Sequence, residues 1–129
     1  MIDTSVAIDL EEVDRTRLPA EIYISALTLA ELASGPYAVS DELARARRRN
    51  RLQRFGTEPE ALAFDSACAR AYGSVYAAVA GAGRKPRGAR AVDLMIAATA
   101  LAYELPLYTR NVKDLQGLES LIEILNVGA

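Results

Sequence analysis

Residues 91–98 read Ala-Val-Asp-Leu-Met-Ile-Ala-Ala, an apolar run that holds a single acid, Asp93. The positions three, four, seven and eight residues after this acid are all apolar, namely Ile96, Ala97, Ala100 and Leu101. This spacing predicts a helix over residues 91–103 that packs inward on the face carrying Asp93. Because Asp93 falls in the first helical turn, where the helix dipole favours negative charge, a purely structural role is the alternative.

Two further acids stand in apolar surroundings. Asp3 follows Met1-Ile2, and Glu31 interrupts the run 27–33 on a face that leans toward the covered side. Burying an ionised carboxylate without a partner costs on the order of several kcal/mol. Three such acids therefore indicate one shared partner, and a divalent cation would serve. The alternatives are a helix cap for Asp3, a role that Thr4 and Ser5 would also suit, and a surface position for Glu31.

Short β-rich runs alternate with longer helical ones, which predicts βαβ units and a parallel sheet in one domain over residues 1–129. If the first strand is central, the ends of strands that carry Asp3, Glu31 and the segment 109–114 converge on one edge. We expect strands at residues 1–3, 22–25, 61–64, 107–109 and 122–125. We expect helices at residues 5–10, 26–34, 40–55, 66–82 and 91–103, a short one near 112–115, and caps at Ser40-Asp41 and Asp65.

The composition limits the catalytic chemistry that is available to this chain. The chain has no histidine and one cysteine, Cys68, which excludes Ser-His-Asp and Cys-His catalysis, an internal disulfide and a zinc site of the usual ligands. Carboxylates and a metal are nearly the only catalytic tools left. We find no apolar run long enough to span a membrane and no signal peptide, so we expect a cytoplasmic protein.

Basic residues gather in two places although the net charge is −2. Such a chain can still present basic surfaces to phosphate groups. The first group lies on the predicted helix 40–55 and comprises Arg45, Arg47, Arg48, Arg49, Arg51 and Arg54. The second lies in the Gly- and Pro-rich loop before Asp93 and comprises Arg84, Lys85, Arg87 and Arg90.

Four segments together resemble PIN-domain ribonucleases of the VapC-like toxin group, and the match covers essentially the whole chain. The segments are Ile2-Asp3-Thr4-Ser5, Leu29-Ala30-Glu31-Leu32, residues 83–100 around Asp93, and residues 107–115 with Thr109-Arg110-Asn111. The resemblance implies a three-layer α/β/α sandwich with a mostly parallel sheet of four to five strands in the order 3-2-1-4-5. It also implies acids that hold Mg²⁺ or Mn²⁺, cleavage of RNA, a homodimer or larger toxin–antitoxin assembly, and inhibition by a VapB-like antitoxin.

Asp3, Glu31 and Asp93 match three acids of the family. The fourth position departs, because Asn111 stands where many members carry Asp, while Asp114 stands three residues later; we favour Asp114 as ligand or neighbour and leave both open. Ser5 and Thr109 would orient carboxylates or water. Arg84, Lys85, Arg87, Arg90 and Arg110 would bind RNA, whereas the arginine-rich helix is a solvated face, an RNA contact or an antitoxin contact. Only two residues precede Asp3, which means either a strained first strand or an initiator methionine chosen too late in the reading frame.

In-line attack by a metal-bound water would leave a 5′-phosphate and a 3′-hydroxyl, and the sequence leaves open whether one or two metal ions take part. The antitoxin would insert an Arg or Lys between the carboxylates. One alternative is a catalytically degenerate PIN-like domain that only binds antitoxin or RNA. A second is a receiver-type signalling domain with Asp65 as phosphoacceptor, but receivers carry adjacent acids after the first strand, where this chain has Thr4-Ser5.

Overall fold

A parallel sheet runs through the centre of the molecule. The structure is a computed structural model and describes residues 1–56, 61–85, 88 and 90–128. Strand β1 (Leu107–Thr109) pairs in parallel with β2 (Ile124–Asn126). Parallel bridges join Ile2 to Tyr108 and Ser25 to Leu62, and the Ile2 N–H donates to the Tyr23 carbonyl. When the five segments are numbered along the chain, their order across the sheet is therefore 3-2-1-4-5, as the resemblance implied.

The regular strands are fewer than predicted. Within the described residues only β1 keeps its predicted bounds, and β2 begins two residues later than predicted. The segments predicted as strands at 1–3, 22–25 and 61–64 contribute single bridges instead. The reason is local: Asp3, Ser25 and Asp65 each cap a helix that begins at the next residue, and the chain leaves the sheet before a longer ladder forms.

The helices follow the predicted pattern closely. The structure contains α1 (Thr4–Ile8), α2 (Ala26–Ser34), α3 (Glu42–Gly56), α4 (Ser66–Gly81) and α5 (Arg90–Ala102). The 3₁₀ helices are η1 (Arg15–Arg17), η2 (Gly35–Ala38) and η3 (Val112–Leu115). The bounds of α2 and η3 are as predicted, whereas η1 and η2 were not predicted. The predicted caps are confirmed, since Asp41 accepts from the Ala44 N–H and Asp65 from the Cys68 N–H.

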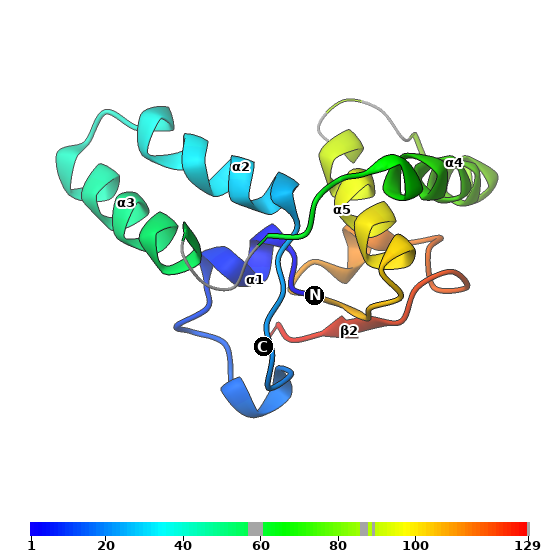
Figure 1. Cartoon of the computed structure of the whole chain (residues 1–129), viewed down its shortest axis with the longest axis horizontal. Coiled ribbons are helices and arrows are strands. Elements are labelled where there is room, and N and C mark those ends of the chain that lie inside the picture. The colour runs from blue at the N-terminus through cyan, green and yellow to red at the C-terminus, as the bar shows by residue number, and fades with distance from the viewer. Residues whose placement is uncertain (57–60, 86–87, 89, 129) are drawn as a thin grey trace.

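Alternate residues of the sheet point to opposite faces and enter two separate cores. Met1 and Leu107 join the core formed with α4 and α5, while Ile2 packs with residues of α1, α2 and α3 on the other face. The helices therefore form one layer on each side of the sheet, which confirms the three-layer α/β/α class (Figure 1). No helix in the described part of the chain has the length and apolarity to cross a bilayer.

Candidate active site

Asp3 is fixed at the end of the first sheet segment by two hydrogen bonds to one oxygen. The Val6 N–H donates to Asp3 Oδ1 at 3.1 Å, which makes Asp3 the N-cap of α1, and the Ser5 hydroxyl donates to the same oxygen at 2.6 Å. The capping role considered for Asp3 is therefore real. Among the described residues nothing hydrogen-bonds to the second oxygen, Oδ2, so the carboxylate can cap the helix and still offer an oxygen to a ligand.

Three of the predicted acids line one pocket at the carboxyl edge of the sheet. The cavity has a volume of about 220 Å³, and its wall includes Asp3, Asp93 and Asp114. Ser5 and Asn111, which the sequence also singled out, lie in the same wall. We call this cavity the acid pocket. It brings together side chains from the first sheet segment, α5 and η3, which are far apart in the sequence.

Burial and the charges of the other acids raise the pKa of Asp93. Its side chain is half-buried in the first turn of α5. Burial raises the pKa of the Asp93 carboxyl to about 6, and the nearby charges of Asp114, Glu31 and Asp3 contribute to the rise, in that order, while Arg90 lowers it. The other three predicted acids therefore all act on Asp93, as expected for carboxylates that share one site.

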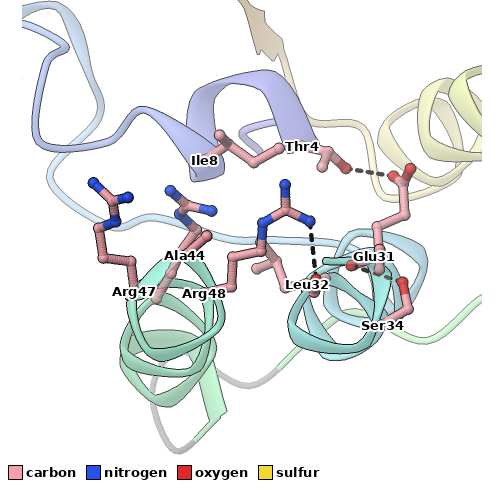
Figure 2. Close-up of a pocket in the computed structure, with 11 residues that line it drawn as sticks. Thr4, Ile8, Glu31, Leu32, Ser34, Ala44, Arg47 and Arg48 are labelled. Carbon is pink, nitrogen blue, oxygen red and sulfur yellow. Dashed lines mark hydrogen bonds between the residues drawn. The ribbon is translucent and has the colours of Figure 1, made fainter. Parts of the chain in front are cut away.

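Glu31 stands at the border of the acid pocket and not in its wall. The Thr4 hydroxyl donates to Glu31 Oε1 at 2.6 Å, as the dashed line in Figure 2 shows. The side chain is exposed, so the expectation that Glu31 leans toward the covered face of its helix is wrong. The buried positions of α2 are Thr28 and Leu32, and Glu31 lies at the exposed edge of that face, where its carboxylate reaches Thr4.

The segment after β1 supports the pocket through its backbone. Thr109 is fully buried, and its Oγ1 accepts from the Asn111 N–H at 3.0 Å. The Arg110 N–H donates to Ser5 Oγ at 3.0 Å, and this serine in turn holds Asp3. Asn111 and Asp114 both line the acid pocket, and the charge of Asp114 raises the pKa of Asp93 more than any other charge does, which favours Asp114 as the fourth acid.

The predicted RNA-binding cations that the structure describes do not form a cluster in the acid pocket. Arg84 Nη1 donates to the Lys113 carbonyl and to Gln116 Oε1, at 2.5 and 2.9 Å. Arg110 Nη1 pairs with Asp9 Oδ2 at 2.8 Å. Lys85 is exposed, Arg90 begins α5, and Arg87 lies outside the described residues. Of the four that are described, none lines the acid pocket.

The donor set fits a hard divalent cation in its chemistry. Carboxylate oxygens from Asp3, Asp93 and Asp114 with the amide oxygen of Asn111 are ligands that suit Mg²⁺ or Mn²⁺. Among the described residues, however, no group of three acidic or cysteine side chains is arranged so that it could hold a metal ion. Like charges repel, so carboxylates that share a pocket without a cation are expected to stay apart.

Two residues that position this site were not among the predicted site residues. Thr4 lines the acid pocket and holds Glu31, although its place in the sequence suggested only a helix cap. Asp9 anchors Arg110, whose backbone supports Ser5. Thr4 could have been predicted from the sequence, because it directly follows Asp3. Nothing in the sequence pairs Asp9 with Arg110, because 101 positions separate them.

Comparison with known proteins supports this interpretation of the fold. The family model described as PIN domain matches residues 1–118, so the chain belongs to the PIN domain family. The chain is similar to a member of the VapBC family of toxin–antitoxin systems, VapBC-5 from Mycobacterium tuberculosis, with 30% identity and a TM-score of 0.82. The alignment covers 98% of this chain and 96% of that chain. No curated protein sequence gives a significant match.

Two more distant structures share the fold. VapBC-1 from nontypeable Haemophilus influenzae has 24% identity and a TM-score of 0.74, over 98% of this chain and 96% of that one. FitAcB from Neisseria gonorrhoeae has 23% identity and a TM-score of 0.73, over 97% and 95%. PIN domains are generally nucleases that depend on divalent metal ions, and the expected resemblance to VapC-like toxins is confirmed. The receiver alternative finds no support, and Asp65 serves as the cap of α4.

Proposed function

We propose that this protein is a Mg²⁺- or Mn²⁺-dependent endoribonuclease that acts as the toxin of a toxin–antitoxin pair. The observation that carries the proposal is the convergence of Asp3, Asp93 and Asp114 on one pocket, with Glu31 at its border, in a chain of the PIN domain family. Without histidine, and with its single cysteine buried, the chain offers few other groups for phosphodiester hydrolysis.

The acids would have distinct roles. Asp3 is the most rigidly held, because Ser5 and the α1 backbone both bond to it, and it would keep one oxygen for the cation. Asp93 would be the central ligand, and Asp114 and Glu31 would complete the shell directly or through water. When bound, a divalent cation would neutralise this negative charge, polarise the scissile phosphate and lower the pKa of a bound water.

The reaction we assign to the site is hydrolysis by in-line attack of water. The water oxygen bonds to phosphorus, the bond between phosphorus and the 3′ oxygen breaks, and the leaving oxygen takes a proton. The products are a 5′-phosphate and a 3′-hydroxyl. A carboxylate of the pocket that does not bind the cation, or a second water, would accept the proton from the attacking water. The ribose 2′-hydroxyl is not needed as a nucleophile.

An antitoxin partner is supported by the similar structures. Their descriptions name VapBC systems, and VapBC2 from Rickettsia felis is described as bound to a DNA fragment from their promoter. By analogy we propose a VapB-like antitoxin that covers the acid pocket, where a basic side chain would meet the carboxylates. We also propose a homodimer or a larger toxin–antitoxin assembly.

The experiment is cleavage of total RNA by the purified toxin, freed of antitoxin, followed by sequencing of the 5′ ends. We expect discrete new 5′-phosphate ends with Mg²⁺ or Mn²⁺ and none with EDTA, and re-added metal should restore them. Cleavage that continues unchanged in EDTA would overturn the metal-dependent proposal. Absence of cleavage by a folded protein that still binds an antitoxin would favour the degenerate domain.

A further inference from the structure

A second cavity adjoins the acid pocket and is lined by arginine. It lies between α1, α2 and α3, has a volume of about 560 Å³, and we call it the arginine groove. Its wall includes Thr4, Ile8, Glu31, Arg47, Arg48 and Arg51. Figure 2 shows Arg47 and Arg48 extending from α3 toward α1, with Glu31 and its bond to Thr4 at the other end.

Three arginines of α3 are engaged within the protein. Arg45 donates to the carbonyls of Pro36 and Val39, and Arg48 donates to that of Gly35. Arg54 forms an ion pair with Glu11. These three arginines therefore hold the α2–α3 hairpin together and tie α3 to the segment after α1.

Arg47 and Arg51 are different, because neither has a hydrogen-bond or ion-pair partner among the described residues. Both line the arginine groove and also the smaller cavity that continues it past Ile8 and Asn50. Their spacing of four residues places them on the same face of α3. Two guanidinium groups therefore face one groove without an ion-pair partner among the described residues, although Glu31 and Glu11 lie in the walls of the two cavities.

The arginine groove and the acid pocket adjoin each other. Thr4 and Ile8 line both cavities, and Thr4 carries the hydrogen bond to Glu31 at their border. A polymer cut in the acid pocket must continue past the cut on both sides, so one arm of the substrate can follow this groove. Ile8, which is 42% exposed, provides an apolar surface along that route.

We infer that Arg47 and Arg51 bind backbone phosphates of the RNA strand beside the scissile bond. This inference rests on the proposed function. It assigns to α3 the phosphate binding that the sequence analysis expected from the loop before Asp93. Guanidinium groups bind phosphate through two parallel N–H donors, and such contacts need no fixed base sequence. An acidic antitoxin segment would meet the same charges, but the position of the groove directly beside the acid pocket favours the substrate.

The test is the salt dependence of RNA binding, measured by fluorescence anisotropy in EDTA on an RNA that the wild-type protein cleaves. Each phosphate that the protein no longer neutralises should reduce the slope of log affinity against log salt by about 0.7 for a single strand. The double variant Arg47→Gln/Arg51→Gln should therefore lose about 1.4 of slope. The variant Arg47→Lys/Arg51→Lys keeps the charge and should retain most of the slope.

The matched control is Arg49→Gln/Arg70→Gln, which removes the same charge from exposed positions on α3 and α4 that line neither cavity. Its slope should stay close to that of the wild type. Equal losses in both double variants, or no loss in either, would overturn the inference. So would weakened antitoxin binding with unchanged RNA binding.

The two proposals can fail separately. If the wild-type protein cleaves RNA with metal but the groove variant keeps its salt slope, the inference about Arg47 and Arg51 is wrong and the nuclease proposal stands. If the wild-type protein neither binds nor cleaves RNA, the proposed function fails first. Thermal unfolding followed by circular dichroism checks that every variant is folded.

Discussion

The acid pocket and the arginine groove share Thr4 and Ile8 but hold their charges in opposite ways. In the acid pocket, Asp3 is fixed by a helix cap and a serine, and Asp93 is half-buried. In the groove, Arg47 and Arg51 extend from a solvated helix without partners among the described residues. Metal binding needs ligands in defined places, whereas phosphate binding tolerates mobile cations, so this contrast agrees with the two roles proposed above.

No ion pair joins the acids of the acid pocket or its border to the arginines of the groove, all of which belong to the described residues. Glu31 and Arg47 line the same groove, yet the structure shows no ion pair between them; Glu31 bonds to Thr4 instead. A phosphodiester with a divalent cation would satisfy both, since the cation neutralises the carboxylates and the phosphates meet the guanidinium groups. The comparison therefore predicts that variants on the two sides have separable effects.

The largest effect should come from Asp93→Asn. This change removes the central negative charge from the acid pocket, and we expect RNA cleavage to fall by about 10³-fold or more, roughly 4 kcal/mol of barrier. RNA binding through the groove should change little. The control Glu123→Gln removes an exposed acid that lines neither cavity and should keep full activity. Unimpaired cleavage by Asp93→Asn would remove this residue from the mechanism.

A smaller effect is expected from Ser5→Ala. The serine donates to Asp3 Oδ1 and accepts from the Arg110 N–H, so its loss removes one of the two hydrogen bonds that hold the carboxylate. Loss of a group that orients a metal ligand typically costs about 10- to 100-fold, and we expect a fall in cleavage rate within that range. Higher Mn²⁺ should restore part of it. Ser74→Ala, on the exposed face of α4, is the control, and an equal loss there would point to a general folding defect.

The raised pKa of Asp93 predicts how stability depends on pH without metal. Protonation favours the folded state, so this contribution is present at low pH and is lost as pH rises from about 4 through about 6. Because the carboxyl is half exposed, solvent screening reduces the effect to about 1 kcal/mol. Urea unfolding in EDTA across that range measures it. Asp93→Asn should flatten the dependence; an unchanged slope in that variant would assign it to another group.

The smallest effect should come from Arg110→Gln. Arg110 pairs with Asp9 at a partly exposed position, which is worth less than about 1 kcal/mol of unfolding free energy. Because Asp9 already neutralises this guanidinium within the protein, we expect the salt slope of RNA binding to stay near that of the wild type. A loss as large as that in the Arg47/Arg51 variant would return Arg110 to the RNA-binding surface that the sequence predicted.

The sequence predicted those helices and strands that short-range features of the sequence determine. The apolar spacing after Asp93 and the cap at Asp65 are short-range features, and α5 and α4 lie within a residue or so of their predicted bounds. The acids could be placed on one edge because they follow strands of a parallel sheet. Residues 1–3 were predicted as a strand, but the cap at Asp3 turns the chain into α1 after a single bridge.

Partner choice between distant segments could not be predicted. Arg84 and Arg110 look alike in the sequence, as cations near the site, yet the structure engages one with the η3 turn and the other with Asp9. In the same way, nothing local separates Arg47 and Arg51 from Arg45 and Arg48, which donate to carbonyls of the α2–α3 connection. Such differences depend on how α3 packs against the rest of the molecule.

The most direct test of the central claim is calorimetric titration of the metal-free protein with Mn²⁺ near neutral pH. If Asp3, Asp93 and Asp114 form a cation site, the wild-type protein and Glu123→Gln will show saturable binding, and Asp93→Asn will show a large loss of affinity. Binding of equal strength in all three proteins, or none in the folded wild type, would contradict the account.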